Sequence, residues 1–167
     1  PECLSAGWSL PDGSRRFPAG EGARFMPHLA PAQRGRRALV LADYGDTGES
    51  MAALVRPHVE TVKVRRHPAD ITLADRIQQG SLSDALRGRH IAIGKMTTAL
   101  IDAAVAGLAV VCLDKRNPVM PVASSSIRDI MNPSRETWLQ GLAWGNWAAN
   151  EIETGELWEC LNTTRSD

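Results

Sequence analysis

The sequence predicts an α/β fold: a Rossmann-like parallel sheet of about four or more strands with helices on both faces and a C-terminal helix pair. Two observations predict it. Short apolar runs alternate with helical patterns and are joined by short loops, which favours parallel strands with crossover helices. The segment 91–121 has this pattern most clearly, as a strand, a polar loop, an alanine-rich helix and a second strand. The expected strands lie near 38–43, 61–65, 91–94 and 109–113.

Each expected strand is a short apolar segment. Leu39 to Leu41 form the centre of the first strand, which ends at Asp43. In the second strand, Val62 and Val64 alternate with charged neighbours, which is the pattern of a half-buried strand. The third and fourth strands, IAIG and LAVVCLD, are almost continuously apolar, as buried parallel strands usually are.

Helical patterns fill the connections between these strands. A short helix is expected over 51–57, and the segment 69–88 is expected to form two helical pieces that break at Gly80. Ser81 or Ser83 then caps the second piece, because a serine hydroxyl accepts a hydrogen bond from a free amide at a helix start.

The two ends of the chain differ from this central pattern. Residues 1–36 are rich in Gly, Pro and Arg without lasting periodicity, so we expect an irregular arm. A long helix is expected over 134–155 and a shorter one over 156–162, which together form the C-terminal pair. The expected Rossmann-like nucleotide-binding domain therefore spans 37–161, and residues 162–167 form a tail.

Composition is that of a globular protein without a membrane span. The chain has 167 residues, of which 43% are hydrophobic, which suffices for one domain with its own core. No apolar run approaches the ~20 residues of a membrane-spanning helix, and the N-terminal segment lacks the order of a signal peptide. Cys3, Cys112 and Cys160 are odd in number and have no CxxC spacing, so we expect free thiols and a cytoplasmic location.

Charge is balanced overall but unevenly placed. The net charge is zero, so no global field draws the protein to nucleic acid. Arginine supplies 16 of the 19 basic residues, and six arginines lie between Arg15 and Arg37. This stretch is either a solvated lead-in or a surface for an anionic partner, since arginine suits bidentate contacts with phosphate.

Polar segments follow all four expected strands, at 43–48, 65–68, 94–98 and 114–117. Ligands of open parallel sheets bind at the carboxyl ends of the strands, so these segments predict one ligand site. Their residue types suit phosphate, and a nucleotide-type ligand is therefore expected. The first of these segments has neither a G-x-G-x-x-G nor a Walker A pattern, and an ordinary strand-to-helix turn is the alternative there.

The strongest candidates lie where the helix after the third strand begins. Lys95, Thr97 and Thr98 place an ammonium group and two hydroxyls beside free backbone amides, a combination that suits phosphate. Simple N-capping by a threonine is the alternative, and it is compatible with phosphate binding. Asp102 lies one helical turn beyond Thr98 and either faces the ligand or forms a local hydrogen bond. Gly107 ends this helix.

Four further candidates lie where the second and fourth strands end. Arg65 and His67 would project from the ligand edge, or they belong to a basic surface turn. Asp114 and Asn117 would hold ribose hydroxyls, or they belong to an ordinary exposed loop. The residue types contain no metal-ligand spacing and no catalytic triad, so we expect no metal and assign no general base.

Three segments resemble the nucleotide-binding half of GT-B type glycosyltransferases, in particular uncharacterised phage and bacterial proteins related to capsular-polysaccharide and glycerophosphate transferases. VKVRRHPAD is similar to the family's strand ending in R-x-H-P. IAIGKMTTALIDAAVAGLAVVCLD is similar to its strand, Ser/Thr loop, helix and strand ending in Asp. SRETWLQGLAWGNWAANEIETGELWECL is similar to its C-terminal helix pair. Together the three segments cover roughly residues 60–161.

The resemblance implies a glycosyltransferase that binds a nucleotide-activated sugar, such as a UDP-sugar, and transfers the glycosyl group to an acceptor such as a polysaccharide or phage-type modified DNA. Basic groups and hydroxyls would neutralise the diphosphate without a metal. The residues that the resemblance assigns to this role are Arg65, His67, Lys95, Thr97 and Thr98.

The chain departs from the family in three ways. The turn after the helix is Gly107-Leu108-Ala109, where the family often has a proline, and threonines replace the usual serine and asparagine in the loop. A GT-B enzyme also has two Rossmann-like domains, whereas this chain is long enough for one. A homodimer, or a partner that supplies the second domain, is therefore expected. The alternatives are a non-catalytic module or subunit that binds a nucleotide or anion, and a structural protein that reuses the fold.

Overall fold

The computed structural model describes residues 3–5, 29–139, 146–148 and 153–155 of the chain. The chain divides into two compact units. The larger unit comprises residues 29–135, and the smaller one comprises residues 1–28 together with 136–167.

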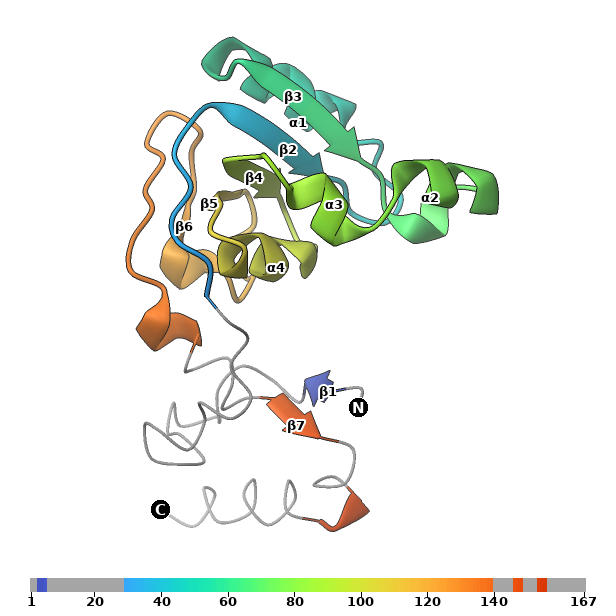
Figure 1. Ribbon diagram of the computed structural model, residues 1–167, viewed down its shortest axis with the longest axis vertical. Coiled ribbons are helices and arrows are strands. Elements are labelled where there is room, and N and C mark those ends of the chain that lie inside the picture. The colour runs from blue at the N-terminus through green and yellow to red at the C-terminus, as the bar shows by residue number, and fades with distance from the viewer. Residues whose placement is uncertain (1–2, 6–28, 140–145, 149–152, 156–167) are drawn as a thin grey trace. The chain divides into compact units, whose positions relative to one another are not determined.

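The larger unit contains a five-stranded sheet in which every pair of neighbours is parallel (Figure 1). The strand order is β3-β2-β4-β5-β6. All four strands expected from the sequence are present, and the predicted α/β class with a parallel sheet is confirmed. The strands are β2 (Arg37–Leu41), β3 (Thr61–Arg65), β4 (Ile91–Gly94), β5 (Ala109–Cys112) and β6 (Ala123–Ser124).

Four α-helices of the larger unit connect or flank these strands, and they are α1 (Glu49–Val55), α2 (Leu73–Gln79), α3 (Leu82–Leu86) and α4 (Ala99–Val105). The break expected at Gly80 is present, because Gly80 follows α2 with a φ of 70°. Ser81 caps α3 by accepting a hydrogen bond from the amide of Asp84, which decides between the two serines that the sequence offered. Three turns of 3₁₀ helix complete the connections: η2 (Arg56–His58), η3 (Pro68–Asp70) and η4 (Met120–Val122).

Helices cover both faces of the sheet. On one face, Met51, Ala52 and Val55 of α1 pack against a cluster that includes Ala38 and Val40 of β2. Successive side chains of a strand point to opposite faces, so the alternate residues of each strand face the other side of the sheet.

On that other face, α4 lies over the centre of the sheet. Leu100, Ala103 and Ala104 of α4 are buried. Gly94 lies two residues after Ala92 in β4 and therefore faces the same side of the sheet. A Cβ added at Gly94 would lie 3.3 Å from Cδ1 of Leu100. The two helices therefore cover opposite faces, as a right-handed parallel fold requires.

Residues 29–36, the last part of the expected irregular arm, have no helix or strand but are held by hydrogen bonds. The amide of Ala30 donates to the carbonyl of Val105, and the amide of Gln33 donates to the carbonyl of Gly107. The buried guanidinium of Arg135 donates to the carbonyls of Ala30 and Ala104. The segment is thus fixed against the C-terminal end of α4 from both sides.

The smaller unit contains an antiparallel pair, β1 (Cys3–Ser5) with β7 (Asn146–Ala148). The prediction of a continuous helix over 134–155 is therefore wrong at 146–148, although residues 136–139 are helical. The physical reason is that Asn146 and Trp147 have no strong helix preference, and pairing with a distant strand overrides the local pattern. The shorter helix expected over 156–162 lies outside the described residues.

Candidate ligand site at the carboxyl edge of the sheet

The strand order creates a crevice between β2 and β4. Counted along the chain, the five parallel strands are arranged second, first, third, fourth, fifth. The connection after β2 leads to one neighbour, and the connection after β4 leads toward the opposite side of the sheet. Loops that diverge in this way leave an opening at the carboxyl ends of the two central strands, where ligands of open α/β sheets bind.

An open pocket of about 360 Å³ lies at this point. Its lining comes from the three loops that follow β2, β3 and β4, so the expected convergence of loops at one sheet edge is found here. The lining residues are Asp43, Tyr44, His67, Met96, Thr97 and Thr98.

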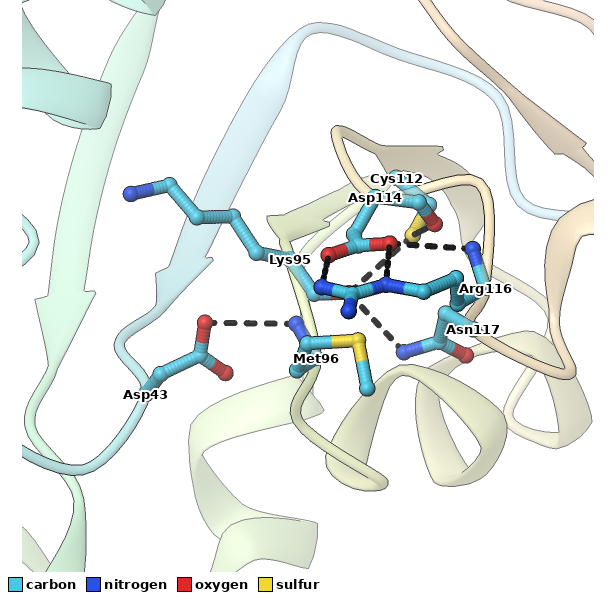
Figure 2. Close-up of polar contacts among 7 residues, drawn as sticks. All are labelled: Asp43, Lys95, Met96, Cys112, Asp114, Arg116 and Asn117. Carbon is cyan, nitrogen blue, oxygen red and sulfur yellow. Dashed lines mark hydrogen bonds and ion pairs between the residues drawn. The ribbon is translucent and has the colours of Figure 1, made fainter.

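Asp43 and Tyr44 form the wall that follows β2. The Oδ2 atom of Asp43 accepts a hydrogen bond from the amide of Met96 at 3.2 Å, which ties the loop after β2 to the loop after β4 (Figure 2). Tyr44 is 71% exposed. Its ring meets the His67 ring edge-on, with centroids 5.7 Å apart and planes at 82°. A carboxylate and an exposed aromatic ring therefore stand side by side at the pocket.

His67 follows β3 and is held by its own turn. Its Nδ1 atom accepts a hydrogen bond from the amide of Ala69 at 3.2 Å and so caps η3. In a neutral imidazole one nitrogen accepts and the other carries the hydrogen, so this contact leaves Nε2 as a donor. His67 thus offers the pocket a hydrogen-bond donor rather than a proton acceptor.

Lys95 does not line the pocket, because its charge is directed at a neighbouring carboxylate. Its Nζ atom lies 3.1 Å from Oδ2 of Asp46. The other oxygen of Asp46 accepts the amide hydrogen of Gly48 at 2.8 Å. The Gly48 amide, followed by the Lys95 ammonium, lowers the pKa of Asp46 below its ordinary value. The lysine expected to bind phosphate is therefore paired within the chain.

Thr97 and Thr98 precede α4 and differ in what their hydroxyls do. Oγ1 of Thr97 accepts a hydrogen bond from the amide of Ala99 at 3.3 Å. Thr98 occupies the N-cap position with helical backbone angles, and its side chain makes no capping hydrogen bond. Thr97, the residue before the N-cap, thus binds the first amide of the helix, and the exposed hydroxyl of Thr98 is left for other contacts.

Arg65 holds the end of a helix instead of facing the pocket. Its guanidinium donates to the carbonyl of Gln79 at 3.1 Å and to that of Gly80 at 2.9 Å. Burial lowers the pKa of Arg65 from its ordinary value. These carbonyls are the unpaired acceptors at the end of α2, so the arginine has a structural role in this arrangement.

Asp114 and Asn117, which follow β5, do not line the pocket. Asp114 forms a two-point ion pair with Arg116, with the shorter contact at 2.7 Å, and this guanidinium lowers the pKa of Asp114 to about 2. Asn117 is 2% exposed and donates to the carbonyl of Lys95 (Figure 2). It also donates to the carbonyl of Thr97. Asn117 therefore holds the loop after β4 in place without lining the pocket.

Two further groups lie near this loop without lining the pocket. Asp102 lies on α4, and partial desolvation raises its pKa. Cys112 is buried and free, and its thiol donates to the carbonyls of Lys95 and Asp114. Burial is the main cause that raises the pKa of this thiol. A buried, protonated thiol is a weak nucleophile, so Cys112 contributes packing here.

The pocket is less basic than the sequence predicts. Within the described residues its lining includes one carboxylate and no lysine or arginine. A second carboxylate lies nearby, since Oδ2 of Asp70 accepts the amide hydrogen of Gly45 at 2.7 Å. Of the eight candidates, three line the pocket: His67, Thr97 and Thr98.

Sequence reasoning named the loop after the first strand but assigned no role to Asp43 and Tyr44, and it missed Met96. The signal for Asp43 was its position at the carboxyl end of a buried strand. Met96 gave no such signal, because an exposed methionine in a loop has no characteristic pattern.

Comparison of the chain with known protein families, curated proteins and solved structures finds no match. Within the described ranges, no helix is long and apolar enough to cross a membrane. In the same part of the chain, no three histidine, cysteine or acidic side chains are grouped so that they could hold a metal ion.

Proposed function

We propose that the carboxyl-edge pocket binds the nucleotide part of a nucleotide-activated sugar, in a glycosyltransferase-like protein. The observation that carries this proposal is the position of the pocket. It lies at the switch point of a doubly wound parallel sheet, with walls from three successive loops. Mononucleotides and dinucleotides bind at this point in folds of this kind. The resemblance of the strand and loop segments to GT-B enzymes supports the same ligand.

The pocket residues suit a nucleoside better than an isolated phosphate. Asp43 has a second oxygen that makes no hydrogen bond within the described residues, and a carboxylate at this edge accepts hydroxyls of a ribose or sugar. The exposed ring of Tyr44 offers a face on which a base stacks. Nε2 of His67 would donate to an oxygen of the ligand.

The phosphates would lie along the loop after β4. The free hydroxyl of Thr98 is one donor there, and Lys95 is the nearest cation in sequence. Lys95 would exchange Asp46 for a phosphate, and Asp46 would keep its hydrogen bond from the Gly48 amide. In glycosyl transfer the nucleoside diphosphate is the leaving group, so a lysine at this place would stabilise the charge that develops on it.

A second candidate function is binding without turnover, as a nucleotide- or anion-binding module of a larger assembly. One observation favours it. Because Nδ1 of His67 is occupied by the Ala69 amide, the imidazole cannot take up a proton through Nε2 while it is neutral. Among the residues that line the pocket, the Asp43 carboxylate is then the remaining candidate base, and one of its oxygens is already occupied.

Calorimetric titration of the full chain with UDP, CDP and their sugars tests both candidates. Lys95→Ala should weaken binding by about tenfold or more, because a hydrogen bond to a charged group contributes about 1.5–3 kcal/mol. Thr98→Ala should weaken it about three- to tenfold without loss of helix capping. The matched control is Lys115→Ala, which removes an exposed lysine from the loop after β5.

The outcomes separate the candidates. Binding with release of the sugar to an added polysaccharide or DNA acceptor supports the transferase, and binding without turnover supports the module. Absence of binding to all of these nucleotides, or an equal loss in Lys95→Ala and Lys115→Ala, contradicts both.

A further inference from the structure

A second pocket, of about 430 Å³, lies at the opposite edge of the sheet, where the strands begin. Gly35 and Arg36 directly precede β2, His58 precedes β3, and Ile91 opens β4. The amino ends of three neighbouring strands therefore meet at this pocket. Its lining residues are Gly35, Arg36, His58, Ile91, Ile127, Arg128 and Ile130.

Arginines are concentrated at this edge. They belong to the segment before β2 and to its first residue, to the turn before β3, to the residue pair before β4 and to the loop after β6. We call them the amino-edge arginines: Arg34, Arg36, Arg37, Arg56, Arg89 and Arg128.

The partners of these arginines within the described residues are a carbonyl, an imidazole and a hydroxyl group rather than carboxylates. Arg36 donates through Nε and Nη2 to the carbonyl of His58, at 3.2 and 2.6 Å. Nη2 of Arg37 lies 3.4 Å from Nε2 of His90. Arg89 donates to a threonine hydroxyl at 3.4 Å. These contacts orient the guanidinium groups without cancelling their charge.

Among the residues that the structure describes, none of the amino-edge arginines forms an ion pair. Arg87, which follows α3, forms an ion pair with Asp84 at 3.5 Å. Glu60 and Asp129 are the acidic residues adjacent in sequence to this edge, and both are exposed. A net positive surface therefore exists within a chain whose overall charge is zero.

The shape of this surface fits a chain of phosphates better than a single anion. Adjacent strands lie about 4.8 Å apart, so the starts of β3, β2 and β4 extend over roughly 10 Å. Successive phosphates of one DNA strand rise about 3.4 Å along the helix axis, so several of them can face this row. Arg36 and Arg128 border a pocket that also contains isoleucine side chains, which suit the carbon atoms of a sugar.

We propose that the amino-edge arginines form a binding surface for the phosphodiester backbone of nucleic acid. The surface takes up one phosphate between Arg36 and Arg128 and contacts neighbouring phosphates through the flanking arginines. It is separate from the carboxyl-edge pocket and does not depend on what that pocket binds. The contacts are to the backbone, so binding is expected to be independent of base sequence.

The test is fluorescence anisotropy of the full chain with a labelled DNA duplex, measured from about 50 to about 200 mM salt. The variant is R34Q/R128Q, because both side chains are exposed and make no hydrogen bond or ion pair within the described residues. We expect about tenfold weaker binding at low salt and a slope of log K against log salt reduced by about two, one for each lost contact.

The matched control is R76Q/K115Q, which removes two exposed positive charges outside this surface. Binding unchanged in the control but weakened in R34Q/R128Q supports the proposal. Equal weakening in both variants overturns it, because the effect would then follow net charge alone. No binding at about 50 mM salt also overturns it. So does equally tight binding of an acidic polyglutamate peptide, because the surface would then recognise carboxylates rather than phosphates.

Discussion

At the scale of single residues, the ion pair between Lys95 and Asp46 determines how readily the carboxyl edge binds an anion. The two side chains are 3.1 Å apart and only partly buried, with 43% of the Lys95 side chain exposed. An ion pair of this exposure is worth about 1 kcal/mol or less. A phosphate can therefore displace the carboxylate at small cost, but the pair still competes with the ligand.

Asp46→Asn should strengthen the binding of UDP, by up to about fivefold, because the substitution removes this competition. The asparagine oxygen still accepts the amide hydrogen of Gly48, so the loop is retained. Calorimetry of single and double variants measures the effect. The gain should vanish in a Lys95→Ala background, and a gain that persists there would contradict the role of Lys95.

Stability should depend on pH through the same carboxylate. The native pKa of Asp46 lies below 3.8, since the Gly48 amide and Lys95 both favour its charged form. Its contribution is therefore fully present above the ordinary pKa and is lost as the pH falls through the lower native value. Urea unfolding should show that Asp46→Asn is less stable than the natural chain at pH ~7 and that this difference shrinks near pH ~3. A difference that does not change with pH would contradict this assignment.

At the scale of elements, the pocket is held by contacts between loops. Asn117 is buried in the loop after β5 and donates to two carbonyls of the loop after β4. Asp43 connects that loop to the one after β2. The loop after β4 is thus fixed from both sides, which favours a preformed site.

The turn before α1 gives a test at this scale. Gly45 and Gly48 both have a φ of 77°, which an L-residue rarely adopts. A Cβ at Gly48 would also lie 2.8 Å from Cγ1 of Val64, whereas one at Gly45 would meet nothing within 4 Å. The two glycines therefore separate backbone strain from packing.

Gly45→Ala should reduce the free energy of unfolding by about 1–2 kcal/mol, the cost of the left-handed conformation. Gly48→Ala should reduce the free energy of unfolding by about 1–3 kcal/mol more than Gly45→Ala does, because the added methyl group overpacks against Val64. Urea unfolding of both variants measures the difference. Equal losses would show that the close contact with Val64 is relieved without cost.

The elements also show what local sequence can predict. β2, β3, β4 and β5 were predicted because each is an apolar run bounded by turn-forming residues. β6 is the two-residue segment Ala123–Ser124 and has no such pattern, since its pairing with β5 alone defines it. β7 was mistaken for helix because its partner β1 lies far away in the sequence.

The site was predictable in position but not in its contacts. The alternation of strands and helices along the chain indicates a parallel sheet, and the polar loops after its strands then lie at one edge, the carboxyl edge. The partners of the charged side chains depend on segments that only the fold brings together. Arg65 meets the end of α2, and Lys95 meets Asp46, a carboxylate from the loop after another strand. No local pattern signals either contact.

At the scale of the whole chain, the larger unit has two edges of different character. The carboxyl edge combines one carboxylate, two hydroxyls and the rings of Tyr44 and His67 around one pocket. The amino edge carries arginines that form no ion pair with any carboxylate in the part of the chain that the structure describes. A ligand with a nucleoside part is therefore expected at the first edge, and a phosphodiester chain at the second. Both expectations follow from one sheet whose strands all run in the same direction.

The most direct test of the nucleotide site is amide chemical-shift mapping of the full chain during titration with UDP. We predict saturable shifts at Tyr44, Thr97 and Thr98, with no comparable shifts at Arg36 and Arg128. Shifts confined to the amino edge, or none that saturate, would contradict a nucleotide site between β2 and β4.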